Sequence, residues 1–168
     1  MIKRIFDLIF IISFSPLILL LFFFTFLICK VINKKDIFFI QDRGGHEGKK
    51  IRVIKFRTMD TDTKKISTFN SFLRKTRLDE IPQFLNILKG DLSLVGPRPL
   101  HFEYKDIYTS DQKKRFNVKP GLTGLAQIQN SYEISWSEQF KIDIWYVENH
   151  NLLLDLKIII KTLFIIIK

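Results

Sequence analysis

Two adjacent acids, Asp79 and Glu80, stand in the stretch TRLDEIPQFLNILKGDLSLVGPRP, Thr76–Pro99. We expect a helix to begin near Asp79, because Pro82 is tolerated only in a first turn and Gly90 is a good C-terminal stop. A helix N-terminus presents free N–H groups and the positive end of the helix dipole, so a carboxylate held there stays ionised. An ionised carboxylate can act as a nucleophile, and the same N–H groups can receive a phosphate.

A phosphate and a carboxylate repel each other, so such a site needs neutralising groups. A divalent cation on one carboxylate and arginines on the phosphate oxygens would supply them. Arg98 lies between Pro97 and Pro99, whose rings stiffen its backbone, so it loses little entropy when it binds a phosphate. Three more cations lie just before the acids: Arg74, Lys75 and Arg77. These are the parts of a phosphoryl-transfer site. The alternative is that the first acid only caps a helix and the arginine is an ordinary loop residue.

Two short strands are predicted ahead of the acids, over 37–41 and 51–56. The turn that joins them is rich in glycine, at Gly44, Gly45 and Gly48. Lys55 and Arg57 are two residues apart, so on a strand they share a face. The apolar run 92–95 predicts a further short strand that leads into the rigid Gly-Pro-Arg-Pro loop. A Pro-Gly turn follows in VKPGLTGLAQI.

Helical patterns occur on both sides of this loop. Before it, an apolar set at i, i+3, i+4 and i+7 predicts a core-facing helix: Ile81, Phe84, Leu85 and Leu88. Thr76 with Asp79 resembles a capping box, which would move the start slightly earlier. After the loop, Ser135 and Glu138 predict a capped amphipathic helix with an apolar set at Trp136, Phe140, Ile144 and Val147. The fold class that follows is α+β, mostly α.

The N-terminal segment is uncharged from Leu8 to Cys29, roughly 33 Å as a helix, which reaches the length of a transmembrane span. Ser15 and Pro16 lie inside it, and a proline removes a backbone bond and kinks a helix. Cations flank both ends, whereas the positive-inside rule favours an asymmetry for a span. These are Lys3, Arg4, Lys30, Lys34 and Lys35. A helix that breaks and returns to the same membrane face and an ordinary kinked anchor both stay open on these residues.

The C-terminal segment LLLDLKIIIKTLFIIIK is apolar apart from a narrow stripe. On a helix Lys157, Lys161 and Lys168 fall within about 40° of one another. This pattern is typical of a helix that lies in the membrane interface with its lysines reaching out, and a buried globular helix is the alternative. The predicted division is a membrane helix over 1–35, a compact cytoplasmic catalytic domain over 36–150 and an interfacial amphipathic helix over 151–168.

Composition narrows the class of partner. The chain has 168 residues with 27 Lys and Arg against 17 Asp and Glu, a net charge of +10. This excess favours an anionic partner, which could be nucleic acid, anionic lipid or a phosphorylated substrate. No standard nucleic-acid motif is visible, and the apolar ends argue against nucleic acid. The single cysteine, Cys29, cannot form an internal disulfide, so an oxidising compartment is not required.

The chain resembles the small monotopic phosphoglycosyl transferases, the bacterial sugar transferases that start lipid-linked glycan assembly. The motifs that carry the resemblance cover nearly the whole chain in order: Ser15–Pro16, Lys55–Met59, Leu73–Pro99, Lys119–Ile128 and Asp143–Asn149. The combination of Asp-Glu-x-Pro-Gln and Gly-Pro-Arg-Pro is highly specific, whereas either alone would be weak.

The resemblance implies a reaction and roles for residues. Family members move a sugar 1-phosphate from a UDP-sugar to a polyprenyl phosphate, such as undecaprenyl phosphate, and release UMP. Asp79 matches the aspartate that attacks the sugar-bearing phosphorus, and Glu80 matches the acid that holds Mg²⁺. Arg74 and Arg98 match arginines assigned to the diphosphate and nucleotide, and Lys55 with Arg57 borders the same site.

The resemblance also implies a location. The N-terminal helix of the family breaks at a Ser-Pro pair, here Ser15 and Pro16, and re-enters the cytoplasmic leaflet. We therefore expect a monotopic protein on the cytoplasmic face of the bacterial inner membrane, with membrane lipids around its apolar ends. The sequence specifies neither the sugar, the glycan pathway, the polyprenol length nor the oligomeric state.

Two departures from the family pattern bear on specificity. After GLAQI many relatives have Gly-Arg-Asn, and here the residues are Gln129, Asn130 and Ser131. Arg77 stands where a small residue is commoner and adds a cation beside the expected nucleophile. Two other functions compete with the transferase. A non-catalytic basic peripheral domain that binds anionic lipid gives no reason for the acid pair, and a phosphatase that uses Asp79 would yield free sugar phosphate.

Overall fold

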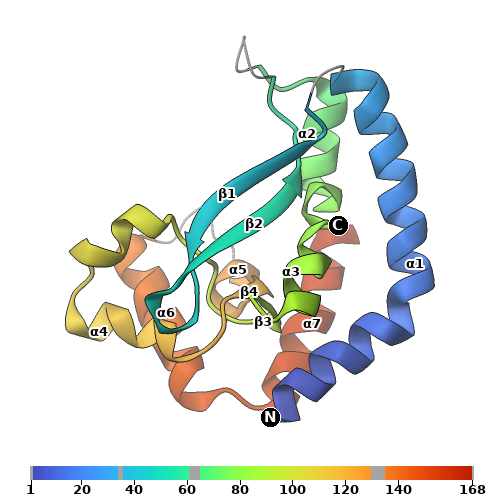
Figure 1. The fold of residues 1–168 in the computed structure, drawn as a ribbon. Coiled ribbons are helices and arrows are strands. Elements are labelled where there is room, and N and C mark those ends of the chain that lie inside the picture. Colours follow the sequence, from blue (N-terminus) through green and yellow to red (C-terminus); the bar gives the residue numbers. More distant parts are fainter. Residues whose placement is uncertain (1, 34–35, 61–64, 130–134, 168) are drawn as a thin grey trace. The chain divides into compact units, whose positions relative to one another are not determined.

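The computed structural model describes the chain except for residues 1, 34–35, 61–64, 130–134 and 168. It is mostly helical with two small two-stranded sheets, as the α+β, mostly α prediction requires (Figure 1). Backbone contacts divide the chain into two compact units. The first contains Met1–Gln41 and Val53–Asn86, and the second contains Asp42–Arg52 and Ile87–Lys168.

The first unit begins with α1, which runs from Ile2 to Asn33 and contains Pro16. It is the one described helix long and apolar enough to cross a membrane by length and composition, with a mean hydropathy of 2.6 over Ile2–Ile32. A β-hairpin follows, formed by β1 (Phe38–Gly44) and β2 (Lys50–Phe56), close to the predicted strands. Its connecting turn and the adjoining strand ends belong to the second unit.

The helix α1 is continuous through its proline, and Figure 1 shows that it is bent. Because Pro16 has no N–H, the carbonyl of Ile12, four residues earlier, lacks its usual backbone donor. The hydroxyl of Ser15 donates to this carbonyl at 2.8 Å. The predicted interruption at Ser15 and Pro16 is therefore a bend in an unbroken helix, and the serine replaces the missing hydrogen bond, as expected for such a site.

The core of the first unit joins α1 to the elements that carry the two acids. Its buried side chains are Cys29, Phe56, Leu73 and Ile81. The ring of Phe22 on α1 lies 5.3 Å from that of Phe56 on β2, and Phe38 lies 5.5 Å from Phe56. Helix α2 (Thr68–Lys75) and the 3₁₀ turn Leu78–Glu80 pack on the same cluster. The apolar helix α1 therefore packs against the turn that carries the acid pair.

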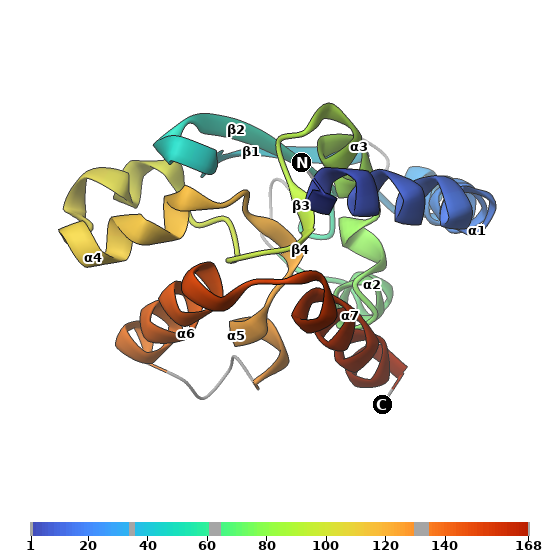
Figure 2. The same ribbon diagram turned by 90° about the horizontal axis from the view of Figure 1, so that it is seen from below.

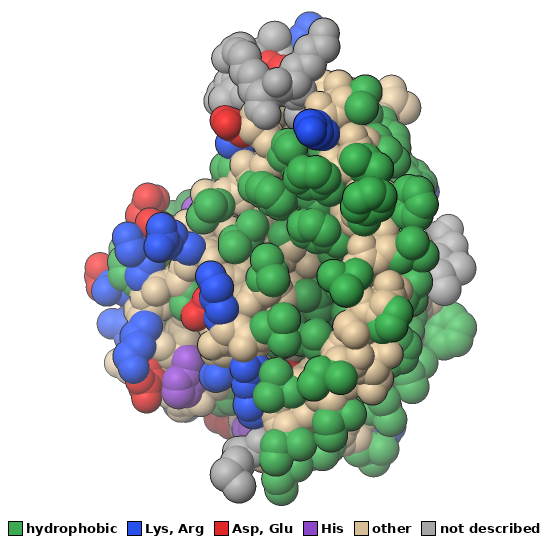
Figure 3. Space-filling view, turned by 45° about the vertical axis from the view of Figure 1, so that its right-hand side comes forward, with side chains coloured by type: hydrophobic (Ala, Val, Ile, Leu, Met, Phe, Trp, Pro, Cys, Tyr) green, Lys and Arg blue, Asp and Glu red, His purple; other side chains and the backbone are tan. Residues whose placement is uncertain are grey.

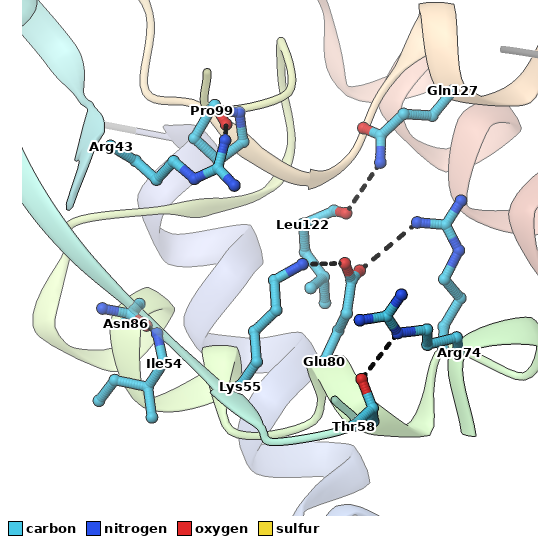
Figure 4. Close-up of polar contacts among 11 residues, drawn as sticks. Arg43, Ile54, Lys55, Thr58, Arg74, Glu80, Asn86, Pro99, Leu122 and Gln127 are labelled. Atoms are coloured by element: carbon cyan, nitrogen blue, oxygen red, sulfur yellow. Dashed lines mark hydrogen bonds and ion pairs between the residues drawn. The ribbon is translucent and has the colours of Figure 1, made fainter. Parts of the chain in front are cut away.

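The predicted apolar face of helix α3 (Gln83–Lys89) is found only in part. Ile81, just before the helix, is buried and Phe84 packs against the core of the first unit, as predicted. Leu85 and Leu88 are 48% and 45% exposed, whereas Gln83 and Asn86 are buried. The side-chain oxygen of Asn86 accepts a hydrogen bond from the N–H of Ile54 on β2, at 3.1 Å (Figure 4). This bond draws the polar face inward, so the assignment of these leucines to the core was wrong. An apolar face directed outward is typical of a helix that lies in a membrane interface.

The second unit is built around a parallel pair of three-residue strands, β3 (Ser93–Val95) and β4 (Gly121–Thr123). Ser93 pairs with Gly121 and Val95 with Thr123. Helix α7 (Leu152–Ile167) packs against both strands (Figure 2). The remaining helices are α4 (Ser110–Lys113), α5 (Leu125–Ile128) and α6 (Trp136–Asn149).

The structure can be compared with two sequence predictions for the helices of the second unit, a capping box on α6 and a lysine stripe on α7. Helix α6 has the predicted capping box, in which the Ser135 hydroxyl accepts from the N–H of Glu138 and the Glu138 carboxylate accepts from the N–H of Ser135. On helix α7 the predicted lysine stripe and the apolar side chains on either side of it are exposed. Lys157 and Lys161 are exposed together with much apolar surface, and Lys168 lies outside the described residues.

Three glycines let the backbone of β4 approach the chain that follows β3. A Cβ atom on Gly121 would lie 2.1 Å from the backbone nitrogen of Gly96, and one on Gly124 would lie 2.2 Å from its carbonyl oxygen. Both distances are far below van der Waals contact, and the atoms met are backbone. Only glycine therefore fits at these positions.

We predict that Gly121→Ala lowers the free energy of unfolding by about 3 kcal/mol or more, because the strands must separate to admit the methyl group. Gly48→Ala is the control, since its Cβ would meet only the Phe116 ring at 3.9 Å and its φ of +69° costs about 1 kcal/mol. Thermal melts in detergent would measure both variants. Equal melting temperatures would contradict the close approach.

Candidate active site

The two acids lie in a 3₁₀ turn, Leu78–Glu80, and not in the first turn of a helix. The N–H of Ile81 donates to the carbonyl of Leu78 at 3.3 Å, three residues back. Pro82 has no N–H with which to donate to that carbonyl in the α-helical pattern, so α3 begins only at Gln83. The predicted helix start near Asp79 is therefore four residues too early.

The residues just before the turn close helix α2. Thr76 ends this helix, and its hydroxyl donates to the carbonyl of Phe72 at 2.9 Å, so it does not cap a helix beginning at the acids. Arg77 follows in the left-handed conformation, with φ of 59°. This sharp reversal separates α2 from the 3₁₀ turn and turns the two carboxylates inward. The predicted capping box of Thr76 with Asp79 is absent from this described segment.

Both carboxylates are buried beside cations. Asp79 is 8% exposed and Glu80 7% exposed. The ammonium of Lys55, on β2, donates to one carboxylate oxygen of Glu80 (Figure 4), and a guanidinium nitrogen of Arg77 lies 3.6 Å from the other. A buried charge is tolerated where it is paired, so Glu80 is held as an anion by one cation on each oxygen.

Asp79 is in a different electrostatic state. Burial, followed by the neighbouring negative charge of Glu80, raises its pKa from 3.8 to about 6. The positive charges of Lys55, Arg74 and Arg77 act in the opposite direction and limit the rise. The expectation that a helix terminus would keep this carboxylate fully ionised is replaced by a balance between desolvation and three cations. Such a raised pKa in a charged cluster is typical of functional carboxylates.

Arg74 is oriented by a residue that the sequence analysis did not single out. Its Nε donates to the hydroxyl of Thr58 at 2.7 Å, and Thr58 is buried (Figure 4). Within the described residues the two terminal nitrogens of Arg74 make no hydrogen bond, so they can receive the oxygens of an anion. Thr58 lies in the quoted motif Lys55–Met59, but nothing in its spacing indicated that it would pair with an arginine sixteen positions later.

The other predicted site residues fall into two places. Arg57, directly after β2, lies 3.6 Å from Asp36, contacts the Phe38 carbonyl at 3.4 Å and lies over the ring of Phe39. The first unit thus brings Lys55, Arg74, Asp79 and Glu80 together. Three predicted residues belong to the second unit, in the loop that follows β3: Pro97, Arg98 and Pro99.

The carboxylate pair has the chemistry of a magnesium ligand. Carboxylate oxygens are the ligands that Mg²⁺ prefers, and Mg²⁺ is commonly held by one or two of them together with water and substrate phosphates. Among the described residues no group of three or more His, Cys, Asp or Glu side chains could hold a metal. A metal at Glu80 would therefore need substrate oxygens or water to complete its shell, and it would compete with Lys55 for the carboxylate.

Comparison with known proteins identifies the family. The model of the bacterial sugar transferase family matches residues 1–168. The chain is 43% identical to an uncharacterized sugar transferase, EpsL, of Bacillus subtilis, over 95% of this chain and 84% of that protein. The chain therefore belongs to the bacterial sugar transferase family, which confirms the resemblance stated on its motifs.

Two further relatives carry names that state an acceptor. One is the undecaprenyl-phosphate galactose phosphotransferase of Salmonella typhimurium, 39% identical over 62% of this chain and 22% of that protein. The other is the UDP-glucose:undecaprenyl-phosphate glucose-1-phosphate transferase of Klebsiella pneumoniae, 37% identical over 80% of this chain and 33% of that protein. The chain spans about a third or less of these longer relatives. Their names differ in the sugar, so membership of the family does not fix it.

We predict that Asp79→Asn stabilises the protein near pH 8 and that the gain disappears as the pH falls toward 4. The unfolded carboxyl ionises near pH 3.8 and the folded one near pH 6, so above pH 6 ionised Asp79 opposes folding, by about 3 kcal/mol. Melting curves at several pH values, in detergent with EDTA, would measure this.

Asp111→Asn is the control for this prediction. Asp111 is exposed, and its hydrogen bond with Lys114 lowers the pKa of its carboxyl, so its replacement should bring no gain at high pH. A gain from Asp79→Asn that is the same at pH 4 and pH 8 would contradict the raised pKa.

Proposed function

We propose that this protein is a phosphoglycosyl transferase that moves a sugar 1-phosphate from a UDP-sugar to a polyprenyl phosphate, such as undecaprenyl phosphate. The observation that carries the proposal is the buried pair Asp79–Glu80 among Lys55, Arg74 and Arg77, in a chain of the bacterial sugar transferase family. The relatives named for undecaprenyl-phosphate acceptors support this reaction class.

In the first step a carboxylate oxygen of Asp79 attacks the sugar-bearing phosphorus of the donor. The bond between this phosphorus and the bridging oxygen breaks, and UMP leaves with that oxygen. The product is a mixed anhydride of Asp79 and the sugar phosphate. The raised pKa suits the role, because a carboxylate that binds protons more tightly is a stronger nucleophile once it is ionised.

In the second step an oxygen of the polyprenyl phosphate attacks the same phosphorus, and the Asp79 carboxylate leaves. Exchange of a UDP-sugar for a polyprenyl diphosphate sugar conserves one phosphoanhydride bond, so little driving force is available. One site used twice lets the soluble donor leave before the lipid acceptor arrives, which is the order expected for a covalent intermediate.

The surrounding cations have distinct roles in this proposal. Glu80 would hold Mg²⁺, which supplies positive charge to the donor phosphates when bound. Arg74, fixed by Thr58, would bind phosphate oxygens through its two terminal nitrogens, and Arg98 would bind the nucleotide diphosphate. When Mg²⁺ takes the place of Lys55 on Glu80, the Lys55 ammonium can bind a phosphate oxygen. Arg57 would lie at the border of the site.

The exposed apolar faces support a location of the reaction at a membrane. Figure 3 shows hydrophobic side chains gathered over α1. On α3, Leu85 and Leu88 are exposed. These surfaces are consistent with membrane association. We propose that the protein is monotopic, on the cytoplasmic face of the bacterial inner membrane, with α1 re-entering the leaflet at its bend near Ser15 and Pro16.

A trapped adduct tests the chemistry. The purified protein is incubated in detergent with Mg²⁺ and a panel of UDP-sugars and then examined by intact mass. We expect a sugar-phosphate adduct and release of UMP with at least one donor, and neither with Asp79→Asn. If no donor gives an adduct or UMP with the wild-type protein, the proposed function is wrong. Free sugar phosphate without lipid would instead indicate a phosphatase.

Cysteine labelling tests the topology. In a Cys29→Ala background, cysteines placed at Lys3 and at Lys30 lie near the two ends of α1. A re-entrant helix predicts that a membrane-impermeant thiol reagent labels both positions from the cytoplasmic side only. Labelling of the two positions from opposite sides would show a transmembrane span. The non-catalytic lipid-binding alternative finds no support in the family comparison and predicts no turnover in either case.

A further inference from the structure

The loop that carries Arg98 is held through its carbonyl groups. Four consecutive carbonyls each accept a hydrogen bond from a different donor: Pro97 from the N–H of Gly121 (3.0 Å), Arg98 from Arg115 (2.7 Å), Pro99 from Arg43 (3.3 Å, Figure 4) and Leu100 from the N–H of Gly44 (2.9 Å). All of these residues belong to the second unit. The donors come from the β-hairpin, from β4 and from the segment after α4.

The two prolines explain why side chains are needed. Pro97 and Pro99 have no N–H, so the loop cannot be tied down by the alternating donors of a β-ladder. Pro97 is nevertheless buried and Arg98, Pro99 and Leu100 are half-buried, so their carbonyls need partners. Two guanidinium groups supply them, on the two carbonyls of Arg98 and Pro99. The backbone of Arg98 is therefore fixed by ring geometry and by charged donors together.

Arg115 is itself held by an acid from another helix. It is 4% exposed, and the nitrogen that donates to the Arg98 carbonyl also donates to the carboxylate of Asp143, on α6, at 2.9 Å. The guanidinium lies over the ring of Phe140 at 5.3 Å. Asp143 is 2% exposed, and burial raises the pKa of its carboxyl to about 6, while the charge of Arg115 acts to lower it. Near neutral pH both partners are therefore charged.

A buried ion pair is weak evidence of a stabilising role, because desolvation of the two charges offsets much of their attraction. The geometric effect of this pair is specific, however. Asp143 fixes the direction of the guanidinium, and the guanidinium fixes the one carbonyl that belongs to Arg98. A rotation of this peptide would move the Arg98 side chain, whose catalytic use depends on where its guanidinium is held.

We propose that Arg115 and Asp143 are positioning residues for donor binding, which act through the backbone of Arg98. This inference rests on the proposed function, in which Arg98 binds the nucleotide diphosphate. Neither residue needs to touch the substrate. Their effect is to hold the loop Gly96–Leu100 so that the Arg98 guanidinium meets the donor without first being ordered.

The test is a double-mutant cycle on the first half-reaction. Formation of the sugar-phosphate adduct is followed against donor concentration for the wild type, Arg98→Ala, Arg115→Ala and the double variant. We expect Arg115→Ala to raise the half-saturating donor concentration about tenfold, and Arg98→Ala at least as much. Since Arg115 acts through Arg98, the double variant should match Arg98→Ala alone. Asp143→Asn should show the same dependence on Arg98 with a smaller effect.

Folding is controlled by melting curves and a matched variant. Thr162→Val removes a half-buried hydrogen bond of the same unit, between the Thr123 and Thr162 hydroxyls at 2.7 Å, and should lower the melting temperature while changing donor half-saturation less than twofold. If Arg115→Ala is not folded at the assay temperature, Arg115→Lys replaces it in the cycle. Lysine keeps the charge but cannot bind the acid and the carbonyl in the same geometry.

Two results would overturn the inference. One is a folded Arg115 variant with the donor half-saturation of the wild type. The other is a double variant whose loss is the product of the two single losses, which would show that Arg115 acts independently of Arg98. Failure of the proposed function itself looks different, because the wild-type protein would then form no adduct with any donor.

Discussion

Two neighbouring carboxylates with little access to water repel each other, and the first unit is organised around this repulsion. Lys55 and Arg77 bind Glu80, so one charge of the pair is neutralised. Within the part of the chain that the structure describes, Asp79 has no such direct partner, and its pKa is raised to about 6. The two adjacent acids therefore differ in their electrostatic state because their surroundings differ. Glu80 is an anion paired with two cations, whereas burial raises the pKa of Asp79.

The supporting structure follows from the need to keep these groups in place. The apolar helix α1 packs on the strand β2 that carries Lys55 and on the turn that carries the acids. In the second unit the Arg98 loop is held by a second buried pair, Arg115 and Asp143. Both units thus use the same device, a buried ion pair that fixes geometry and contributes little to stability by itself. Apolar side chains are also exposed on α1 and on α3, which is consistent with membrane association.

Much of this arrangement could be predicted where the determinants are local. The hairpin was expected at 37–41 and 51–56 and was found at Phe38–Gly44 and Lys50–Phe56, because strand and turn residues signal it directly. The capping box of α6 depends only on Ser135 and Glu138. The acid pair could be singled out from the sequence because Asp-Glu-x-Pro-Gln occurs together with Gly-Pro-Arg-Pro, a highly specific combination.

The features that could not be predicted depend on contacts distant in sequence. The parallel pairing of β3 with β4 joins segments nearly thirty residues apart, and each strand is only three residues long. Asn86 of α3 is buried because it bonds to β2, whereas Leu85 and Leu88, which the apolar pattern assigned to the core, are exposed. The start of α3 was misplaced because Pro82 favoured a 3₁₀ turn before it. The partners of Arg74 and Arg115 follow from the fold alone.

Hydroxylamine can show directly whether Asp79 forms a covalent bond to phosphorus, as we propose. This reagent converts an acyl phosphate to a hydroxamate at the residue that carried it, so quenching the protein with hydroxylamine during reaction with its donor marks the nucleophile. We expect a hydroxamate in the peptide that contains Leu78–Glu80, located at Asp79 and dependent on the donor. A hydroxamate at Glu80 or elsewhere, or none despite release of UMP, would contradict this proposal.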